Sequence, residues 1–416
     1  MTASTQELAL ARLRRLYQLN PLGSNLMMGP ALFLLALEYG AGDLAMGVLY
    51  AGGYLAGGVA VFAPWLCARI DPARLTILAW WGRAWCGAPY LLLPFLASPV
   101  AKVVLLVACF MGFAAVRMVG IIALNVATTA YVDVGRRPRL IAYAHVWYNV
   151  GVLGGTLLTT ALLFWHTGEA GYLSVLILGV LATFAAAHEL RGLPAVGMRH
   201  ERMRPLPWGD HGVREAMRTT ALVVPQAVAA AYQVSSLRSV QELSSGMIVA
   251  LTVVGVLGAI LATRWLTRSL PRFGLKRVQI GVHAALVVVG LAWAFSGIVP
   301  EQARTWTCMA LYVASQPLLA MSLALMSAIQ VDRLPPRGVV GASAIIQATG
   351  ALGGAVGVFL IWLSAGWGLE RLPGAGAYAH AFLLWAACSL TICIMGRVAG
   401  RAPTAVDGLQ AVNERE

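Results

Sequence analysis

One arginine of this chain lies deep inside a long apolar stretch. Arg117 falls within the apolar run at 100–126, between the segments VACFMGFAAV and MVGIIAL, and Asn125 follows it in the same run. A charge inside a membrane-length apolar segment is costly, and such residues commonly mark solute or ion pathways. The sequence therefore offers Arg117 as a binding residue. The alternative is a structural arginine that binds a backbone carbonyl or a neighbouring helix.

Acidic side chains are scarce in the apolar runs. Glu38, Asp43 and Glu242 all fall near the ends of runs. Proton-coupled carriers usually rely on buried carboxylates. A coupled mechanism in this chain would have to use His145 or His283, because imidazoles titrate near neutral pH. A facilitator that needs no coupling ion is the other possibility.

Motifs of soluble enzymes do not occur in the sequence. It contains no GxSxG, no P-loop and no HExxH, which are the signatures of hydrolases, nucleotide-binding proteins and zinc proteases. The lack of a P-loop also argues against an ATP-driven pump. The six cysteines form no CxxC pair and have no ligand spacing with histidine, so we expect neither disulfides nor a metal site. We predict no enzymatic activity and no cofactor.

The composition is that of a chain embedded in a bilayer. Hydrophobic residues make up 59% of it and charged residues 11%, whereas soluble proteins are about half apolar and a quarter charged. A helix needs roughly 20 apolar residues to cross a membrane. Twelve runs meet this length, and the seventh is the weakest because it holds two glutamines, two serines and a proline. The runs lie at 21–40, 43–66, 76–97, 100–126, 140–165, 171–188, 219–240, 243–266, 278–298, 305–330, 339–365 and 378–397.

Lysine and arginine residues fix the expected topology. With the N-terminus inside, the inner segments hold 24 of the 30 basic residues and the outer loops hold four, Lys102, Arg238, Arg304 and Arg371. Cytoplasmic loops carry this excess in membrane proteins. The bias accounts for the net charge of +13 without a nucleic-acid partner. It predicts a multi-pass protein of the inner (plasma) membrane, with both termini cytoplasmic and no removable signal peptide.

A long polar stretch divides the runs into six and six. We therefore expect an N-terminal six-helix half at 1–190, a cytoplasmic central loop at 191–218, a C-terminal six-helix half at 219–400 and a cytoplasmic tail at 401–416. Glycine is in surplus in the second, fifth, eighth and eleventh runs. Small residues let helices approach closely, so we expect these four helices to pack at one interface.

These features together resemble the major facilitator superfamily. Local motifs support the resemblance: 270–278 is similar to the family's basic loop after the eighth span, with Pro271 where the family often has aspartate, and 66–74 is a degraded match after the second span. In the fourth span Arg117 precedes a glycine by three residues rather than four, and 151–155 lacks the proline of exporter-type members. The resemblance implies gating loops that contain Arg69, Asp71, Arg74, Arg272, Gly274, Lys276 and Arg277.

In such a fold the substrate binds near the bilayer midplane, between the halves, and interrupted helices point to the site. The first and seventh runs each open a half, and each is interrupted, at Gly29–Pro30 and at Pro225. The implied substrate-binding residues are Arg117, Asn25, Asn125, His145, Tyr148, Asn149, Gln226, Tyr232, Gln233, Gln316 and Gln347. Each of these polar side chains has an alternative role as an interhelical hydrogen bond.

A second arginine in a span, Arg83, lies among Trp80, Trp81 and Trp85. The resemblance places the third span at the periphery of the bundle. We therefore expect Arg83 to be structural, stacked on a tryptophan and extended towards the inner surface.

The sequence thus predicts an all-α polytopic membrane protein of about 12 helices in two six-helix halves, monomeric in the lipid bilayer. Its expected function is that of a secondary transporter or facilitator that moves a small-molecule substrate by alternating access. Two intramembrane arginines and few intramembrane acids favour an anionic or polar neutral solute. Two alternatives stay open: an exporter of lipophilic compounds, and a non-transporting bundle of the same fold that serves as a membrane assembly factor or sensor.

Overall fold

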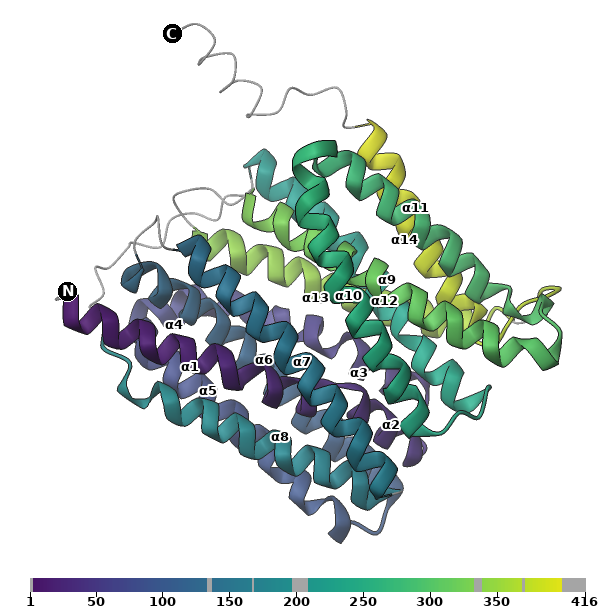
Figure 1. The fold of residues 1–416 in the computed structure, drawn as a ribbon, viewed down its shortest axis with the longest axis horizontal. Helices are drawn as coiled ribbons and strands as arrows, with labels where there is room; N and C mark the ends of the chain where they lie inside the picture. The colour runs from purple at the N-terminus through teal and green to yellow at the C-terminus, as the bar shows by residue number, and fades with distance from the viewer. Residues whose placement is uncertain are drawn as a thin grey trace, which may run out of the picture.

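The computed structural model describes residues 3–132, 137–166, 168–196, 209–332, 339–368 and 371–398. Within these residues the regular secondary structure is helical throughout, as the sequence predicts, and the helices pack lengthwise in a bundle (Figure 1). There are fourteen α-helices in the described parts of the chain. Because α1 continues into α2 and α3 into α4, these helices make twelve passes along the bundle.

The first six passes form the N-terminal half. Side-chain caps begin two of their helices: Asp71 accepts hydrogen bonds from the backbone at the start of α5, and Ser98 does so for α6, where free N–H groups need acceptors. The passes are α1 (Ala3–Met28) with α2 (Pro30–Glu38); α3 (Asp43–Leu55) with η1 (Ala56–Phe62) and α4 (Ala63–Arg69); α5 (Pro72–Gly87) with η2 (Ala88–Phe95); α6 (Pro99–Tyr131); α7 (Arg137–Trp165); and α8 (Glu169–Glu189), followed by η4 (Leu190–Gly192).

The last six passes form the C-terminal half. Asp210 and Ser244 cap the first two of them in the same way. The passes are α9 (His211–Ser239), α10 (Ser245–Phe273), α11 (Leu275–Ala294) with η5 (Ser296–Ile298), α12 (Glu301–Asp332), α13 (Val339–Ala365) and α14 (Ala379–Val398). The stretches 197–208 and 399–416, which contain much of the predicted central loop and the whole predicted tail, lie outside the described residues.

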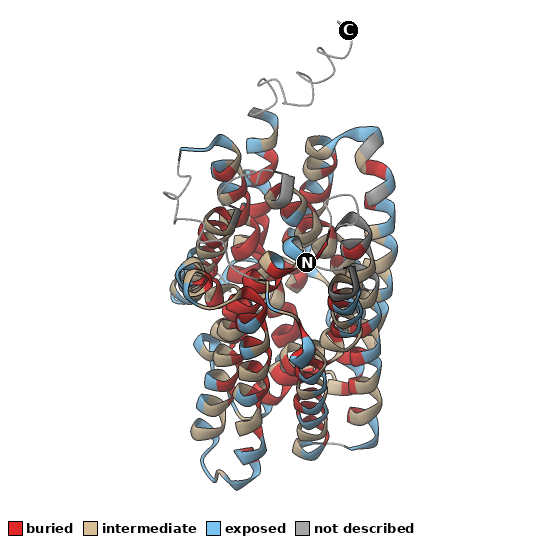
Figure 2. Ribbon diagram, turned by 90° about the vertical axis from the view of Figure 1, so that its left-hand side faces the viewer, coloured by how far each residue is buried: buried red, intermediate tan, exposed pale blue. Residues whose placement is uncertain are grey.

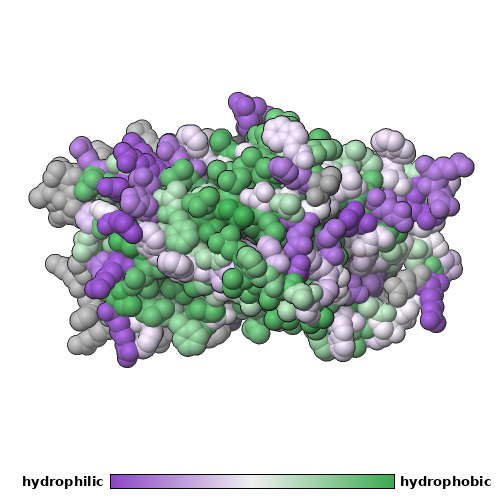
Figure 3. Space-filling model, turned by 90° about the horizontal axis from the view of Figure 1, so that it is seen from below, coloured by the Kyte–Doolittle hydropathy of each residue, from purple (hydrophilic) through white to green (hydrophobic). Residues whose placement is uncertain are grey.

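The surface has the hydropathy of a membrane protein. Nine helical segments of the described chain are long and apolar enough to cross a bilayer. The other three passes are the first, which breaks at Gly29, the third, which carries Arg83, and the seventh, which carries Gln226 and Gln233. In Figure 3 hydrophobic side chains gather over the centre and left-centre of one face, and hydrophilic ones lie at its left end and across its right half. Buried residues line the inner sides of the helices (Figure 2).

The first pass is interrupted and the seventh is not. At Gly29, between α1 and α2, a β-carbon would collide with the carbonyl oxygen of Asn25. The predicted interruption at Gly29–Pro30 is therefore confirmed. The predicted interruption at Pro225 is wrong, because α9 continues through this proline. Neighbouring helices can re-satisfy backbone groups that a proline frees, and Gly357 of α13 packs directly against Pro225, 3.1 Å from it at the β-carbon position.

The glycine-rich passes pair across the two halves as two separate seams. One seam joins α3 and η1 to α13, where a β-carbon on Gly57 would collide with the backbone of Gln347. The other joins α7 to α10, where a β-carbon on Gly246 would lie 3.4 Å from the ring of Phe164. Gly151 and Gly155 instead pack on α1 of their own half. All four passes therefore pack between the halves, but as two pairs of helices rather than as one four-helix interface.

We name the two ends of the bundle by the chain termini. The proximal end is the end at which α1 begins and α14 ends, and the distal end is opposite (Figure 1). At the proximal end Arg12 and Arg15 lie 3.4 and 3.3 Å from the carboxylate of Glu189. Lys102 lies at the distal end, 2.8 Å from Glu169. The two groups therefore lie at opposite ends of the bundle, and which end faces the cytoplasm stays a prediction.

The turn between α10 and α11 consists of a single glycine. Gly274 has φ +75° and ψ 154°, a region that costs other residues about 1–3 kcal/mol. We therefore expect Gly274→Ala to lower the free energy of unfolding by about that amount and to lower the melting temperature in detergent. Gly281→Ala is the matched control, because a β-carbon there meets no atom within 4 Å. Equal melting temperatures for the two variants would contradict the prediction.

Candidate functional site

Arg117 meets side chains from two other passes inside the N-terminal half. It is half-buried on α6 and makes no hydrogen bond or ion pair with the part of the chain that the structure describes. Tyr54 of α3 lies within electrostatic reach of both Arg117 and Tyr148 of α7. The structure thus brings together Arg117, Tyr54 and Tyr148, which we call the Arg117 cluster. Tyr54 was not predicted, because no sequence signal marks it as more than a packing tyrosine.

Arg83 is fully buried and held by neutral groups. It donates to the amide oxygen of Asn20 at 2.9 Å and to the hydroxyl of Ser24 at 2.8 Å, both on α1. Its guanidinium lies over the rings of Trp80, at 5.0 Å, and Phe113, at 4.6 Å. The predicted stacking on a tryptophan is confirmed. The predicted extension to the surface is wrong, because the side chain instead braces α1 against α5.

The remaining predicted residues of the N-terminal half lie on α1, α6 and α7. Asn25 is half-buried against Gly155, and its amide oxygen has no hydrogen-bond partner within the described residues. Asn125 is exposed on α6, and Asn149 is half-buried on α7. The side chain of His145 lies outside what the structure describes.

In the C-terminal half, three of the four predicted glutamine positions serve helix packing. The amide oxygen of Gln233 accepts a hydrogen bond from the Ser315 hydroxyl at 3.1 Å. Gln316 packs its aliphatic carbons on Gly255, and the backbone of Gln347 packs on Gly57.

Gln226 is the fourth of these glutamines. It is buried on α9, and its amide oxygen is unpartnered in the described chain. The amide nitrogen of Gln233 is likewise buried and unpartnered there. A buried polar atom without a partner is costly, so Gln226 and Gln233 are the candidates for a ligand contact from this half.

Tyr232 closes the distal end of the seam. Its hydroxyl donates to the backbone carbonyl of Asp43 at 3.1 Å, and its ring lies 5.1 Å from that of Tyr50 and 5.7 Å from that of Tyr378. Tyr50 in turn shares a 2.8 Å hydrogen bond with Ser235. We call these residues (Tyr50, Tyr232, Ser235 and Tyr378) the distal seal. Its two hydrogen bonds join the halves through residues that are 185 and 189 positions apart in the sequence.

Polar contacts surround the distal seal. Arg238 of α9 lies 3.2 Å from the carboxylate of Glu38 on α2, and Tyr172 of α8 donates a hydrogen bond to Ser245 of α10. Both contacts cross from one half to the other. The ion pair is about one-third exposed at each partner, and such pairs contribute about 0–1 kcal/mol. The aromatic contacts, rather than this ion pair, therefore hold the distal end closed.

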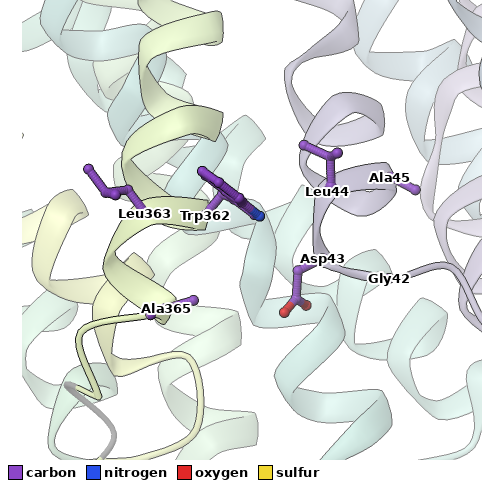
Figure 4. A pocket seen from close by; sticks show the side chains of 8 residues that line it. Gly42, Asp43, Leu44, Ala45, Trp362, Leu363 and Ala365 are labelled. Carbon is purple, nitrogen blue, oxygen red and sulfur yellow. The ribbon is translucent and has the colours of Figure 1, made fainter.

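A groove of about 740 Å³ opens beside the distal seal, between the start of α3 and the end of α13. Figure 4 shows Asp43 and Trp362 on the two sides of this groove, with Leu44 and Ala365 on the same two helices. The groove lies at the distal edge of the seam, and none of the predicted substrate-binding residues lines it.

The predicted gating-loop residues lie at the proximal end. Asp71 caps α5 and also accepts the backbone N–H of Val196 at 3.0 Å, so it ties the start of α5 to the segment that follows α8. Arg69 stacks over Trp65 at 4.1 Å. The other members are Gly274 in the one-residue turn, the exposed Arg74, Arg272 and Arg277, and the half-buried Lys276. Their role in gating stays a prediction.

Comparison with known proteins identifies the fold through solved structures rather than through sequence. No family model and no curated protein matches the sequence. Solved structures that are similar include a nucleoside transporter (TM-score 0.65, 12% identity, covering 95% of this chain and 100% of that one). A bacterial homologue of the iron transporter ferroportin in an inward-facing state is similar with TM-score 0.65, 14% identity and coverage of 97% and 100%. The E. coli xylose transporter in a partially occluded inward-open conformation is similar with TM-score 0.63 and 14% identity, and the match covers 97% of this chain and 100% of that one. Over nearly its whole length, therefore, the chain has the fold of the major facilitator superfamily.

Proposed function

We propose that this protein is a secondary transporter or facilitator that carries a small solute by alternating access. The observation that supports this most directly is Arg117, a cation held without a partner among the described residues of a fold that transporters use. The distal seal closes one end of the seam in this structure. In this state the solute would reach the Arg117 cluster from the proximal end, and opening of the distal seal would complete the cycle.

The proposed solute is a small polar molecule that carries an anionic group. Acidic residues at 43, 71 and 133 fall only at the ends of the second to fifth passes, so these passes offer Arg117 no internal carboxylate. A guanidinium presents a planar fork of donors that matches carboxylate or phosphate. The hydroxyls of Tyr54 and Tyr148 add donors beside it. Such a set binds a small organic acid or a phosphorylated compound.

A transport assay in sealed proteoliposomes tests the proposal. The panel consists of small carboxylates and phosphates, neutral sugars and nucleosides, and lipophilic cations. We expect saturable movement of at least one anion and competition among anions. Movement of the lipophilic compounds alone would instead support the exporter alternative. A well-folded protein that moves none of these solutes would support the assembly or sensor role.

The exporter alternative rests on one specific observation. The groove between α3 and α13 opens at the seam, and its walls include Leu44, Trp362 and Leu363. An apolar opening of this kind gives lipophilic molecules a lateral route from the bilayer. The two functions differ in where the ligand binds: an anion would need Arg117, whereas a lipophilic compound would need Trp362.

We also propose that the protein acts as a monomer in the plasma membrane, with its proximal end in the cytoplasm. The 24-to-4 distribution of basic residues supports this orientation, because basic residues are retained on the cytoplasmic side.

Weakening the distal seal should shift the protein towards an open distal end. Tyr232→Ala removes two ring pairs, each worth about 0.5–1.5 kcal/mol. We therefore expect a cysteine introduced at Ser235 to react about 5- to 150-fold faster with a water-soluble maleimide. The control, Arg238→Gln, removes the rim ion pair and a hydrogen bond to the Leu243 carbonyl of its own half, but no ring contact. It should change the rate by about five-fold or less. A larger effect from Arg238→Gln than from Tyr232→Ala would contradict this account of the seal.

A further inference from the structure

A second groove lies in the C-terminal half, away from the Arg117 cluster. It has a volume of about 330 Å³ and runs between α10, α11 and α12. Its walls include Trp265, Phe273, Val278, Gly281 and Leu318, with Arg277 at its proximal end. Trp265 and Phe273 are 52% and 55% exposed, so the groove opens on the outer surface of the bundle.

Gly281 leaves the floor of this groove open. A β-carbon built on it meets no atom within 4 Å. This differs from Gly57 and Gly357, whose β-carbon positions face another helix closely. Gly281 therefore does not lie at a close contact between two helices. Its missing side chain leaves apolar space at the surface of the helix, and a ligand can occupy that space.

The segment that joins α10 to α11 beside the groove carries only positive charge. The segment 264–277 contains five basic residues and no acidic one. Arg277 is exposed and makes no hydrogen bond or ion pair with the described residues. The one-residue turn at Gly274 begins α11 directly after α10 and so places Arg277 in the first turn of α11, at the proximal end.

We propose that this groove binds an anionic phospholipid, with the phosphate on Arg277 and part of one acyl chain along Gly281. Basic pockets between helices on the cytoplasmic side suit anionic headgroups, and the predicted topology puts the proximal end in that leaflet. Tryptophan at this level is typical of the membrane interface. The volume lies at the low end of ligand sites, about 300–1,000 Å³, so it fits a segment of one chain rather than a whole lipid. An apolar floor beyond the arginine favours a lipid over a soluble anion.

Native mass spectrometry of the full chain in detergent tests the proposal. The protein is titrated with dioleoyl phosphatidylglycerol, which is anionic, and in parallel with dioleoyl phosphatidylcholine, which has the same chains but no net charge. We expect phosphatidylglycerol to bind more tightly. Arg277→Gln should weaken its binding about five-fold, which corresponds to roughly 1 kcal/mol per basic residue near anionic lipid. Gly281→Leu fills the floor of the groove and should weaken binding at least about ten-fold.

Two matched variants serve as controls. Arg214→Gln removes an exposed arginine of α9 that does not line the groove, and Gly154→Leu places a leucine at another glycine with open space around it. Both should bind phosphatidylglycerol as the unmodified chain does. The melting temperature of Gly281→Leu, which should be unchanged, shows that the variant is folded.

Three results would overturn the proposal. Equal binding of the two lipids would mean that Arg277 does not recognise the phosphate. Unchanged binding in a folded Gly281→Leu variant would place the lipid elsewhere. Displacement by millimolar inorganic phosphate would identify a soluble anion as the ligand. None of these measurements involves transport, so the proposal stands or falls independently of the proposed function.

Discussion

Arg117→Ala should strongly weaken transport of an anionic solute while the protein stays folded. A hydrogen bond to a charged group contributes about 1.5–3 kcal/mol, so losing one such contact weakens solute affinity roughly 10- to 150-fold. The fold should survive because Arg117 holds no other group of the described chain by a hydrogen bond or ion pair. The measurement is uptake in proteoliposomes together with the melting temperature of the same purified variant.

Arg117→Lys separates the two possible roles of this arginine. Lysine keeps the charge but loses the planar fork, so a ligand role predicts weaker affinity at normal stability. A bracing role predicts that both variants lose stability and leave solute preference unchanged. Arg83→Gln is the matched control, since Arg83 is tied to Asn20 and Ser24 and should lower the melting temperature. Normal transport by a folded Arg117→Ala protein would exclude both roles.

Gly57→Leu should be the most damaging substitution at the seam between the halves. A β-carbon on Gly57 would collide with the backbone carbonyl of Gln347 on α13, and the backbone of a helix cannot give way as a side chain can. Overpacking of this kind costs about 1–3 kcal/mol or more. We expect reduced yield of folded protein, a lower melting temperature and little or no transport.

Gly53→Leu is the control in the same pass. The nearest atom to a β-carbon on Gly53 is the terminal methyl carbon of Met28, at 3.7 Å, and a methionine end can move. This variant should fold and melt close to the unmodified protein. If Gly57→Leu and Gly53→Leu were equally tolerated, the close approach of η1 and α13 would carry no energetic weight.

Local sequence patterns predicted the passes well, because the apolar length that defines a pass depends only on the residues within it. Apolar length placed the twelve passes, and the glycine and proline at 29 and 30 placed the break in the first. Pro225 misled the prediction, since whether a proline breaks a helix depends on what packs against it. Here that partner is Gly357, more than a hundred residues away in the sequence, where an added β-carbon would lie 3.1 Å from the α-carbon of Pro225.

The site was less predictable than the fold, because its members meet only through packing. Polar residue type pointed to Arg117 and Tyr148, but nothing in the sequence distinguished Tyr54 from a packing tyrosine. Tyr232 was predicted to bind substrate, and the structure places it in the distal seal against Asp43 and Tyr50. From the sequence alone, each polar residue in a span could bind a ligand or form a hydrogen bond between helices. Contacts between distant passes decide between the two, and a single sequence does not contain them.

The 3-10 segment η1 separates two α-helical parts of the second pass, α3 in the distal seal and α4 at the proximal end. A 3-10 helix advances about 2.0 Å and 120° per residue, and an α-helix about 1.5 Å and 100°. Rewinding the seven residues of η1 into α-helix would therefore shorten the pass by about 3.5 Å and turn α4 by about 140° relative to α3. A different side of α4 would then face the partner half, and Arg69 would move with it. A change in the winding of η1 would thus rotate the proximal part of the second pass, α4, without moving its distal part, α3.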